Sequence, residues 1–292
     1  MGIMCEPHMM THIDIVIKFG GSAVTDKGCF ETYRPDVTSK LAQHVKDCHE
    51  AGMSCIIVHG AGSFGHHQAK EYAINEGLRG ATKEDHKHKI WGYCLVRQSV
   101  LKLNNAVVNS LIDVGVPAIS ISPGTSWKVK DRQPLHWPHE VLEQYLLSGL
   151  VPVFHGDCCM DTDLTCSILS GDTVIKAICS NFNVKKVVFV TDVAGIYDRP
   201  PNFQDAKLLK TLKVDERGDL TESIQLSSSA NDVTGGMKLK LKSAIDIVVQ
   251  TNGQCSVYIT GYSSPNLSDV LLCKGHSEDW NVTRIVKNDV SS

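Results

Sequence analysis

The stretch His-Gly-Ala-Gly-Ser-Phe-Gly-His at 59–66 contains residue types that can bind a phosphate. Its three glycines let the backbone approach a ligand closely and leave amide N–H groups free to bond anionic oxygens. His66 stands at the far end of this loop and could donate a further hydrogen bond. The apolar run at 54–58 predicts a buried strand, so the loop would lie at the carboxyl edge of a sheet. The residues alone fit either a phosphate site or a tight strand–helix turn.

The same loop formally matches the dinucleotide-binding pattern Gly-x-Gly-x-x-Gly. That pattern also requires a second strand that ends in an acidic residue roughly 20 residues further on. The corresponding segment, 83–89, is Lys-Glu-Asp-His-Lys-His-Lys and has no strand pattern. The sequence therefore excludes a dinucleotide-binding unit, and the absence of a Walker A motif excludes a P-loop kinase.

A second glycine loop follows the strand predicted near the amino terminus. Lys18 would place a cation at the end of that strand, and Gly20, Gly21 and Ser22 add backbone and hydroxyl donors. Lys27 follows a few residues later. These groups suit the charged phosphates of a nucleotide, although a surface lysine beside a turn remains the alternative.

Three further segments carry polar residues at the ends of predicted elements. Asp172 stands at the start of a predicted helix, where it could also be only a helix cap. Asp192 and Tyr197 lie in the turn after a strongly apolar strand. Gly235 and Lys238 precede an amphipathic helix, whose amino terminus favours an anion.

Helical and strand patterns alternate along the chain, which predicts an α/β fold with a mainly parallel sheet. We expect helices at about 35–51, 67–77, 84–114, 138–148, 171–183 and 236–250, and strands near 13–18, 54–58, 117–121, 151–154, 187–191 and 255–259. The segment 126–137 indicates a hairpin. This pattern predicts a three-layer sandwich, with helices on both faces of the sheet.

These five segments, in this order, resemble the amino-acid kinase superfamily and, within it, the isopentenyl phosphate kinases. The loop that ends in His66 is the discriminating motif. Members that phosphorylate carboxylates lack this histidine, whereas the isopentenyl phosphate and fosfomycin kinases have it. The resemblance implies an amino-acid kinase-like fold in a single domain, 1–292. Its acceptor-binding half would span about 13–183 and its nucleotide-binding half about 184–287.

The resemblance also implies a role for each candidate residue, with ATP and Mg²⁺ as cofactors. His66 would hold the acceptor phosphate in line, and Asp172 would orient the lysines. Magnesium would bind the ATP phosphates, with no dedicated protein metal site. The implied catalytic residues are Lys18, Lys27, His66 and Asp172; the nucleotide-binding residues are Lys18, Gly20, Gly21, Ser22, Gly62, Asp192, Tyr197, Gly235 and Lys238; the acceptor-binding residues are Ala61, Gly62, His66 and Gly156.

Three functions are compatible with these motifs. The first is phosphorylation of isopentenyl phosphate to isopentenyl diphosphate, and the second is phosphorylation of another small phosphate or phosphonate, as in fosfomycin kinases. Apolar residues such as Ile90, Trp91 and Tyr93 would line a lipid-tail pocket and favour the first, although such a helix face can equally belong to the core. The third is a non-catalytic nucleotide sensor, which need not keep both the γ-phosphate and the acceptor groups.

The composition limits the kinds of partner that the chain is expected to bind. With 29 basic and 32 acidic residues and no basic block, the chain does not predict binding to nucleic acid or to an anionic membrane. No apolar run reaches the roughly 20 residues of a membrane span. Eleven cysteines without a C-x-x-C pair indicate reduced thiols in a cytoplasmic protein. His86 and His88 lack partners for a metal site. The superfamily resemblance implies a homodimer.

Overall fold

An eight-stranded sheet forms the centre of the computed structural model, which describes residues 11–221, 234–275 and 278–288. Its strands lie in the order β12 (Thr211–Val214), β14 (Thr283–Lys287), β13 (Ser256–Gly261), β11 (Lys186–Thr191), β2 (Ile15–Phe19), β3 (Cys55–His59), β7 (Val151–His155) and β4 (Ala118–Ile121). All neighbouring strands are parallel except β13 and β14. The inner strands β11, β2, β3 and β7 are buried along their whole length, as expected for parallel strands covered on both faces.

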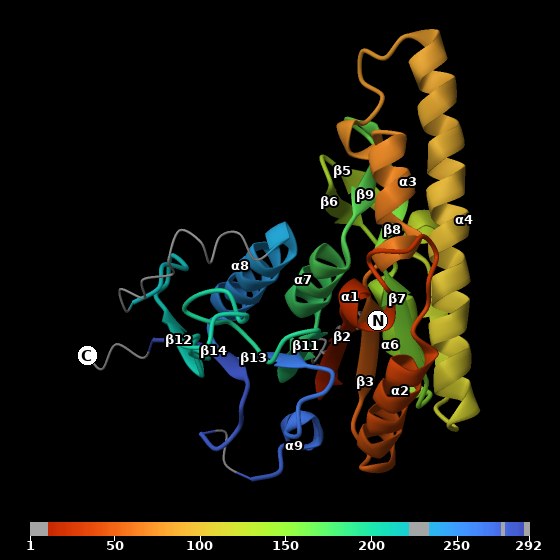
Figure 1. Cartoon of the computed structure of the whole chain (residues 1–292). Coiled ribbons are helices and arrows are strands. Elements are labelled where there is room, and N and C mark those ends of the chain that lie inside the picture. Colours follow the sequence, from red (N-terminus) through yellow and green to blue (C-terminus); the bar gives the residue numbers. More distant parts are fainter. Residues whose placement is uncertain (1–10, 222–233, 276–277, 289–292) are drawn as a thin grey trace, which may run out of the picture.

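Helices cover both faces of this sheet (Figure 1). They are α1 (Gly21–Val24), α2 (Pro35–Glu50), α3 (His66–Glu71), α4 (Lys83–Asp113), α5 (Pro123–Ser126), α6 (His139–Leu147), α7 (Gly171–Asn181), α8 (Thr234–Gln250) and α9 (Leu267–Leu272). Helices α2, α4 and α9 pack on one face, and α6, α7 and α8 pack on the other. Alternate strand residues point to the two faces: Ile15 and Ile17 join the first core, and Val16 the second. The predicted three-layer α/β sandwich is confirmed.

A smaller sheet extends the molecule beyond the carboxyl ends of β3 and β7. It contains β6 (Gln133–His136), β5 (Lys128–Lys130), β8 (Asp157–Asp161) and β9 (Thr165–Leu169), in that order. Together with α3 and the first half of α4, it forms the upper part of Figure 1. The hairpin predicted at 126–137 is confirmed by β5 and β6. Strands β12 and β14, and a short pair of β1 (His12–Ile13) and β10 (Asn183–Val184), were not predicted.

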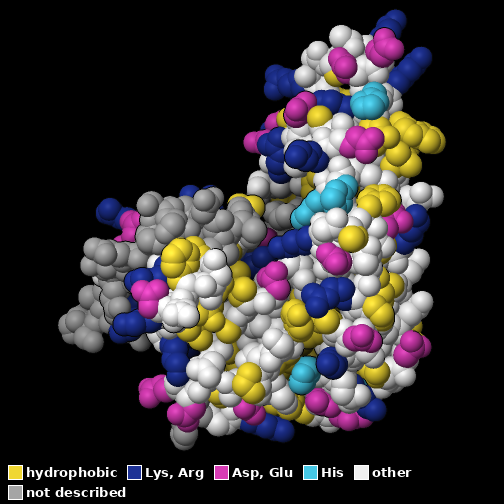
Figure 2. Space-filling model, in the orientation of Figure 1, with side chains coloured by type: hydrophobic (Ala, Val, Ile, Leu, Met, Phe, Trp, Pro, Cys, Tyr) yellow, Lys and Arg dark blue, Asp and Glu magenta, His cyan; other side chains and the backbone are white. Residues whose placement is uncertain are grey.

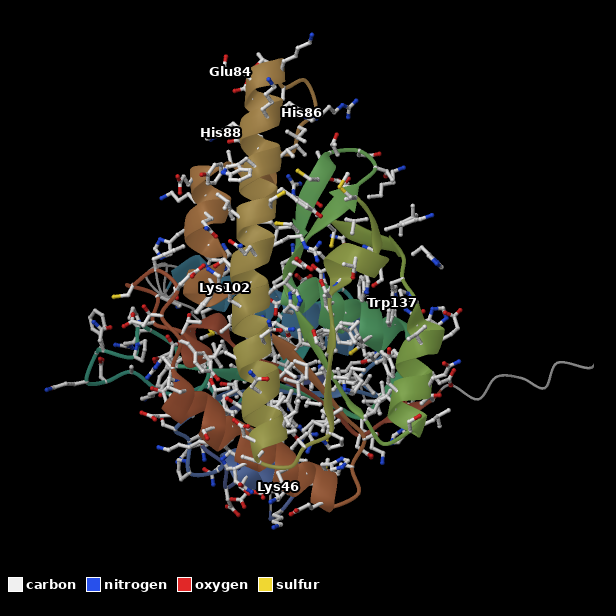
Figure 3. All side chains as sticks on the ribbon, turned by 90° about the vertical axis from the view of Figure 1, so that its right-hand side faces the viewer. Lys46, Glu84, His86, His88, Lys102 and Trp137 are labelled. Atoms are coloured by element: carbon white, nitrogen blue, oxygen red, sulfur yellow. The ribbon has the colours of Figure 1, made fainter. Side chains whose placement is uncertain are left out.

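The helix α4 is the longest element, and its start is set by a capping box. The Thr82 hydroxyl accepts from the Asp85 amide, and the Asp85 carboxylate accepts from the Thr82 amide. Figure 3 shows Glu84, His86 and His88 at the projecting end of this helix, with Lys102 further along. Gly92 lies against Tyr72, where an added Cβ would come 2.2 Å from the Tyr72 Cβ.

The helix predicted over 67–77 is shorter than expected. Helix α3 ends at Glu71, because Ala73 adopts a left-handed conformation (φ 47°) that a helix cannot continue. A 3₁₀ turn, η2 (Ile74–Glu76), follows. The other predicted helices and strands agree with the structure to within about two residues, as is usual at element ends.

Two further findings concern membrane spans and cysteines. Within the described ranges, no helix combines the length and apolarity that crossing a bilayer requires. The ten cysteines of these ranges are free thiols. No group of three or more His, Cys, Asp and Glu side chains could hold a metal ion in the described part of the chain, His86 and His88 included.

Candidate functional site

Glycine loops meet at the carboxyl ends of β2, β3 and β7. An added Cβ on Gly21 would lie 2.6 Å from the amide nitrogen of Gly62, and one on Gly60 would lie 2.8 Å from that of Gly21. Gly62 has a φ of +51° and faces the Thr25 hydroxyl, which accepts from the next amide. These positions require glycine because backbone meets backbone without room for a side chain.

Lys18 and Asp172 form a buried ion pair where these loops meet. The Lys18 ammonium donates to the Asp172 carboxylate, and the Lys18 side chain is almost fully buried. Asp172 lies in the first turn of α7, but it is not the helix cap, because the Ser170 hydroxyl accepts the capping hydrogen bond from Thr173. The Asp172 carboxylate is therefore available to pair with Lys18.

Lys27 and Asp192 form a second, more open pair. Lys27 Nζ lies 3.8 Å from Asp192 Oδ2, and both side chains are about half exposed. Burial raises the pKa of Asp192, but the Thr191 hydroxyl and Lys27 outweigh this and hold the pKa below its usual range. An exposed pair of this kind is weak, so a bound anion can readily take over the lysine.

Lys240 is a site residue that the sequence analysis missed. The pKa of Lys240 is lowered to about 8, mainly by burial and further by the charges of Lys18 and Lys27, while Asp172 and Asp192 oppose the effect. The ammonium of Lys240 therefore lies among both ion pairs.

Lys238, which the sequence analysis predicted to bind the nucleotide, is exposed and lines a neighbouring cleft. Helical periodicity explains the difference. Lys240 shares the inward stripe of α8 with Ala244 and Val248, whereas Lys238 stands on another face. That stripe is a signal the sequence contains. Gly235 lies in the first turn of α8.

His66 begins α3 directly after the glycine loop and faces the lysines. Partial burial lowers the pKa of His66, and the charges of Lys27, His67, Lys18 and Lys240 contribute in the same direction. Both histidines are exposed at the surface, but the His67 ring packs edge-on against Phe30 at 6.2 Å. The two adjacent histidines therefore have different surroundings.

A cleft of about 1010 Å³ opens beside this cluster, between α7 and α8. Its lining includes Thr173, Gly195, Tyr197, Lys238 and Leu241. Thr173 follows Asp172, so the cleft adjoins the ion pairs and is large enough for a nucleoside. Figure 2 shows Lys, Arg and His side chains in the hollow between the two parts of this face.

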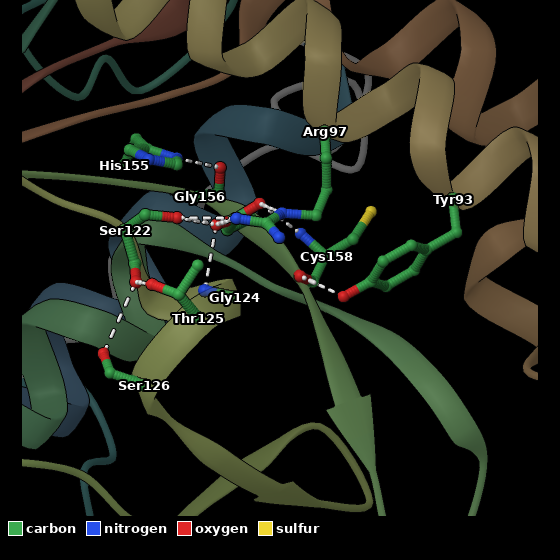
Figure 4. Close-up of polar contacts among 10 residues, drawn as sticks. Tyr93, Arg97, Ser122, Gly124, Thr125, Ser126, His155, Gly156 and Cys158 are labelled. Atoms are coloured by element: carbon green, nitrogen blue, oxygen red, sulfur yellow. Dashed lines mark hydrogen bonds and ion pairs between the residues drawn. The ribbon is translucent and has the colours of Figure 1, made fainter.

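The turn after β7 is held by a buried polar cluster that the sequence analysis did not predict (Figure 4). The Asp157 carboxylate accepts from Arg97 Nε at 3.1 Å, from the Ser122 hydroxyl at 2.5 Å and from the Gly124 amide at 2.9 Å. This cluster ties α4 to the start of β8. The amide of the preceding Gly156, an expected acceptor contact, donates to the His59 carbonyl at 3.2 Å.

An apolar cluster lies behind His66, between α3, α4 and β8. Its buried members are Ala69, Ile74, Val96, Val100 and Cys158, with Ala61, Tyr72, Tyr93 and Ile168 packed against them. The expectation that Trp91 lines an apolar pocket is wrong, because its side chain is 62% exposed on the outer face of α4.

The model of the amino acid kinase family matches residues 15–261. The chain belongs to this family. It is 34% identical over 233 residues to the isopentenyl phosphate kinase of Methanothermobacter thermautotrophicus, a match that covers 78% of this chain and 84% of that protein. This relative places the chain with the isopentenyl phosphate kinases.

Other members agree with this placement. An isopentenyl phosphate kinase of Arabidopsis thaliana is 38% identical over 202 residues, which cover 65% of this chain and 59% of that protein. A solved structure of an isopentenyl phosphate kinase superimposes with a TM-score of 0.76 at 29% identity, covering 93% of this chain and 99% of the other. The UMP kinase of Ureaplasma parvum, at 15% identity and a TM-score of 0.59, shares the fold alone.

Proposed function

We propose that this amino acid kinase family member transfers the γ-phosphoryl group of ATP to isopentenyl phosphate and so forms isopentenyl diphosphate and ADP. The observation that carries the proposal is the convergence of Lys18, Lys27 and Lys240 on a glycine loop that ends in His66. The names of the relatives supply the substrate.

The reaction requires positioning and charge neutralisation. An oxygen of the acceptor monophosphate attacks the γ-phosphorus, and the bond between that phosphorus and the β–γ bridging oxygen breaks as ADP leaves. Phosphate monoesters are largely ionised at pH 7, with a second pKa of about 6, so no strong general base is needed. Cations and N–H donors are the groups that such a site needs, and they predominate here.

Each half of the chain has its own task in this proposal. In the acceptor half, about 13–183, His66 and the Ala61 amide bond the acceptor phosphate, because the Ala61 amide has no partner among the described residues. In the nucleotide half, about 184–287, the cleft beside Tyr197 takes the nucleoside. Lys18 and Lys240 meet the transferring phosphoryl group between the halves, while Asp172 orients Lys18.

Magnesium fits this site as a partner of the nucleotide phosphates. Asp172 is paired with Lys18 and Asp192 with Lys27, so we assign neither of them as a metal ligand. Mg²⁺ commonly keeps several waters and binds through substrate phosphates with few protein ligands. When bound, it would supply charge neutralisation on the phosphates.

The test is ADP release with a panel of acceptors. We expect turnover with isopentenyl phosphate that greatly exceeds turnover with fosfomycin, because a hydrocarbon tail would pack beside the apolar cluster around Val96. Faster turnover with fosfomycin would favour the phosphonate kinase, and ATP binding without any turnover would favour the sensor. We also propose that the protein is a homodimer in the cytoplasm. Sedimentation equilibrium would measure the mass of the assembly in solution.

A further inference from the structure

Two buried histidines lie beneath the glycine loops and take no part in the reaction proposed above. His59 ends β3 and His155 ends β7, and the two are register partners in the sheet. Both are fully buried, and their rings stack with centroids 5.6 Å apart at an interplanar angle of 28°. Each one directly precedes a glycine of the site, Gly60 or Gly156.

Both rings make the same local hydrogen bond. Nδ1 of His59 lies 3.1 Å from the Gly60 carbonyl oxygen, and Nδ1 of His155 lies 3.0 Å from that of Gly156 (Figure 4). A carbonyl oxygen only accepts, so each Nδ1 must carry the proton. Burial lowers the pKa of both rings, that of His59 to about 4, so both are neutral with a bare Nε2.

The other side of His59 supports this tautomer. Its Nε2 lies 3.1 Å from Oδ1 of Asn104, whose nitrogen lies 2.5 Å from the Ser120 hydroxyl. With the proton on Nδ1, the bare Nε2 of His59 and the Oδ1 of Asn104 would be two acceptors that face each other. Turning the Asn104 amide by 180° resolves the conflict, because its nitrogen donates to Nε2 and its oxygen accepts from Ser120. The groups of His59, Asn104 and Ser120 are then satisfied with the His59 proton on Nδ1, whereas Nε2 of His155 has no hydrogen-bond partner among the described residues.

The hydrogen bond to Gly60 determines where the next amide points. In a trans peptide the C=O and N–H groups point in opposite directions. Since His59 holds the Gly60 carbonyl, the Ala61 N–H points away from the ring, and it has no partner among the described residues. This amide is the one assigned above to the acceptor phosphate.

The hydrogen bond from His155 to Gly156 affects the position of Asp172, the acidic partner of Lys18. The Gly156 carbonyl is held by His155, and its amide donates to the His59 carbonyl at 3.2 Å. Both peptides of Gly156 are thereby oriented, and the residue packs so closely on Gly171 that an added Cβ would lie 3.3 Å from the Gly171 nitrogen. Gly171 begins α7 and precedes Asp172, the partner of Lys18.

We propose that His59 and His155 are positioning residues, which hold the carbonyls of Gly60 and Gly156 and thereby orient the Ala61 amide and seat the first turn of α7. This inference rests on the proposed function, because it assigns a purpose to the Ala61 amide. The two His-Gly pairs act as matching supports beneath the acceptor loop and the Lys18–Asp172 pair.

The first test is independent of activity. Nitrogen-15 NMR of the histidine-labelled full chain at pH 7 should show two rings that are neutral and protonated at Nδ1, and substitution should assign them to His59 and His155. Protonation at Nε2, or an imidazolium in either ring, would overturn the proposal. Because no substrate is involved, this result stands whether or not isopentenyl phosphate is the acceptor.

The second test compares side chains that replace one ring nitrogen at a time. Asparagine can place an amide nitrogen near Nδ1, whereas glutamine reaches toward Nε2. We expect His155→Asn and His59→Asn to keep the KM for the acceptor within about threefold of the parent. Their glutamine counterparts should lose between about tenfold and 100-fold in kcat/KM for the acceptor, with the KM for ATP unchanged.

Thermal melts of all four variants separate positioning from folding. If asparagine and glutamine variants of equal melting temperature lose the same activity, the Nδ1 hydrogen bond has no catalytic consequence and the proposal fails. If the parent turns over a different phosphate instead, the comparison is made with that acceptor, and only the proposed substrate is wrong.

Discussion

At the residue scale, His66 differs from the adjacent His67 in its neighbours. Both side chains are exposed, but His66 faces Lys27, Lys18 and Lys240, whereas the His67 ring packs beside Phe30. Partial burial and three cations lower the pKa of His66, so its neutral form predominates at pH 7 in the free protein. An incoming phosphate dianion reverses that electrostatic balance, since it favours the protonated ring.

Replacement of His66 should therefore affect the acceptor more than the nucleotide. We expect His66→Ala to lower kcat/KM for the acceptor by about 10²–10³, the effect of removing one oxyanion-type donor. ATP affinity measured by calorimetry should stay within a factor of about two. His67→Ala is the matched control and should retain parental kinetics. Near-parental turnover of His66→Ala would exclude the assigned role.

Lys240 and Lys238 provide a second matched pair. Lys240→Met should lower kcat by at least about 10², because it removes a cation from the γ-phosphate region, whereas Lys238→Met should alter only the KM for ATP. The pKa of Lys240 is about 8 in the free protein, so its charge is lost as the pH rises through that value. We expect kcat/KM for ATP to fall above pH 8 and this fall to be absent in Lys240→Met. A pH profile shared by the parent and this variant would contradict the assignment.

At the scale of elements, the inner face of α4 is buried beside the site and its outer face is exposed. Val96 is buried in the apolar cluster behind His66, and Tyr93 donates from its hydroxyl to the Cys158 carbonyl at 3.1 Å. Trp91, on the same helix, is exposed. The capping box and the Arg97–Asp157 cluster hold this helix at a defined rotation, so the inner face stays directed at the loop.

Shrinking the inner face should change the preferred length of the acceptor. Each buried CH₂ is worth about 0.8 kcal/mol when room exists, and overpacking costs about 1–3 kcal/mol when it does not. We expect Val96→Ala and Tyr93→Ala to raise the ratio of kcat/KM for ten-carbon over five-carbon monophosphates, mainly by relieving a clash. Trp91→Ala should leave this ratio unchanged. Equal ratios in all three variants would mean that the tail lies elsewhere, for example along β4.

At the scale of the whole molecule, the buried histidine pair links the fold to pH. The unfolded chain protonates His59 near its ordinary pKa of about 6.5, whereas in the fold that pKa is about 4. Between these values the unfolded state binds more protons, so the free energy of unfolding decreases as the pH falls. Asp14 and Asp161 have lowered pKa values, with that of Asp14 at about 2, so their contributions are lost mainly below this window.

Urea denaturation from pH 7 to pH 4 measures this linkage. We expect the free energy of unfolding to fall by about 3 kcal/mol from His59 alone, at about 1.4 kcal/mol per pKa unit. His59→Gln should be less stable at pH 7 but should show a shallower loss between pH 6.5 and 4. A parental slope in this variant would mean that His59 is not the group that titrates.

The sequence by itself determined the loops and the layers. Runs such as 54–58 and 187–191 predict buried parallel strands because only a sheet covered on both faces buries every residue of a strand. Glycines after two of these strands predict close backbone approach, and the structure places Gly21 against Gly60 and Gly62. These features are local or periodic, so they can be read along the chain.

Only the tertiary structure decided which side chains meet. Lys240 rather than Lys238 joins the lysine cluster because the rotation of α8 is set by packing of its apolar stripe on the sheet. Asp172 pairs with Lys18, 154 residues away, because the fold brings the end of β2 close to the start of α7. The stacking of His59 on His155 and the burial of Asp157 depend likewise on strands brought together from distant segments, which no local pattern specifies.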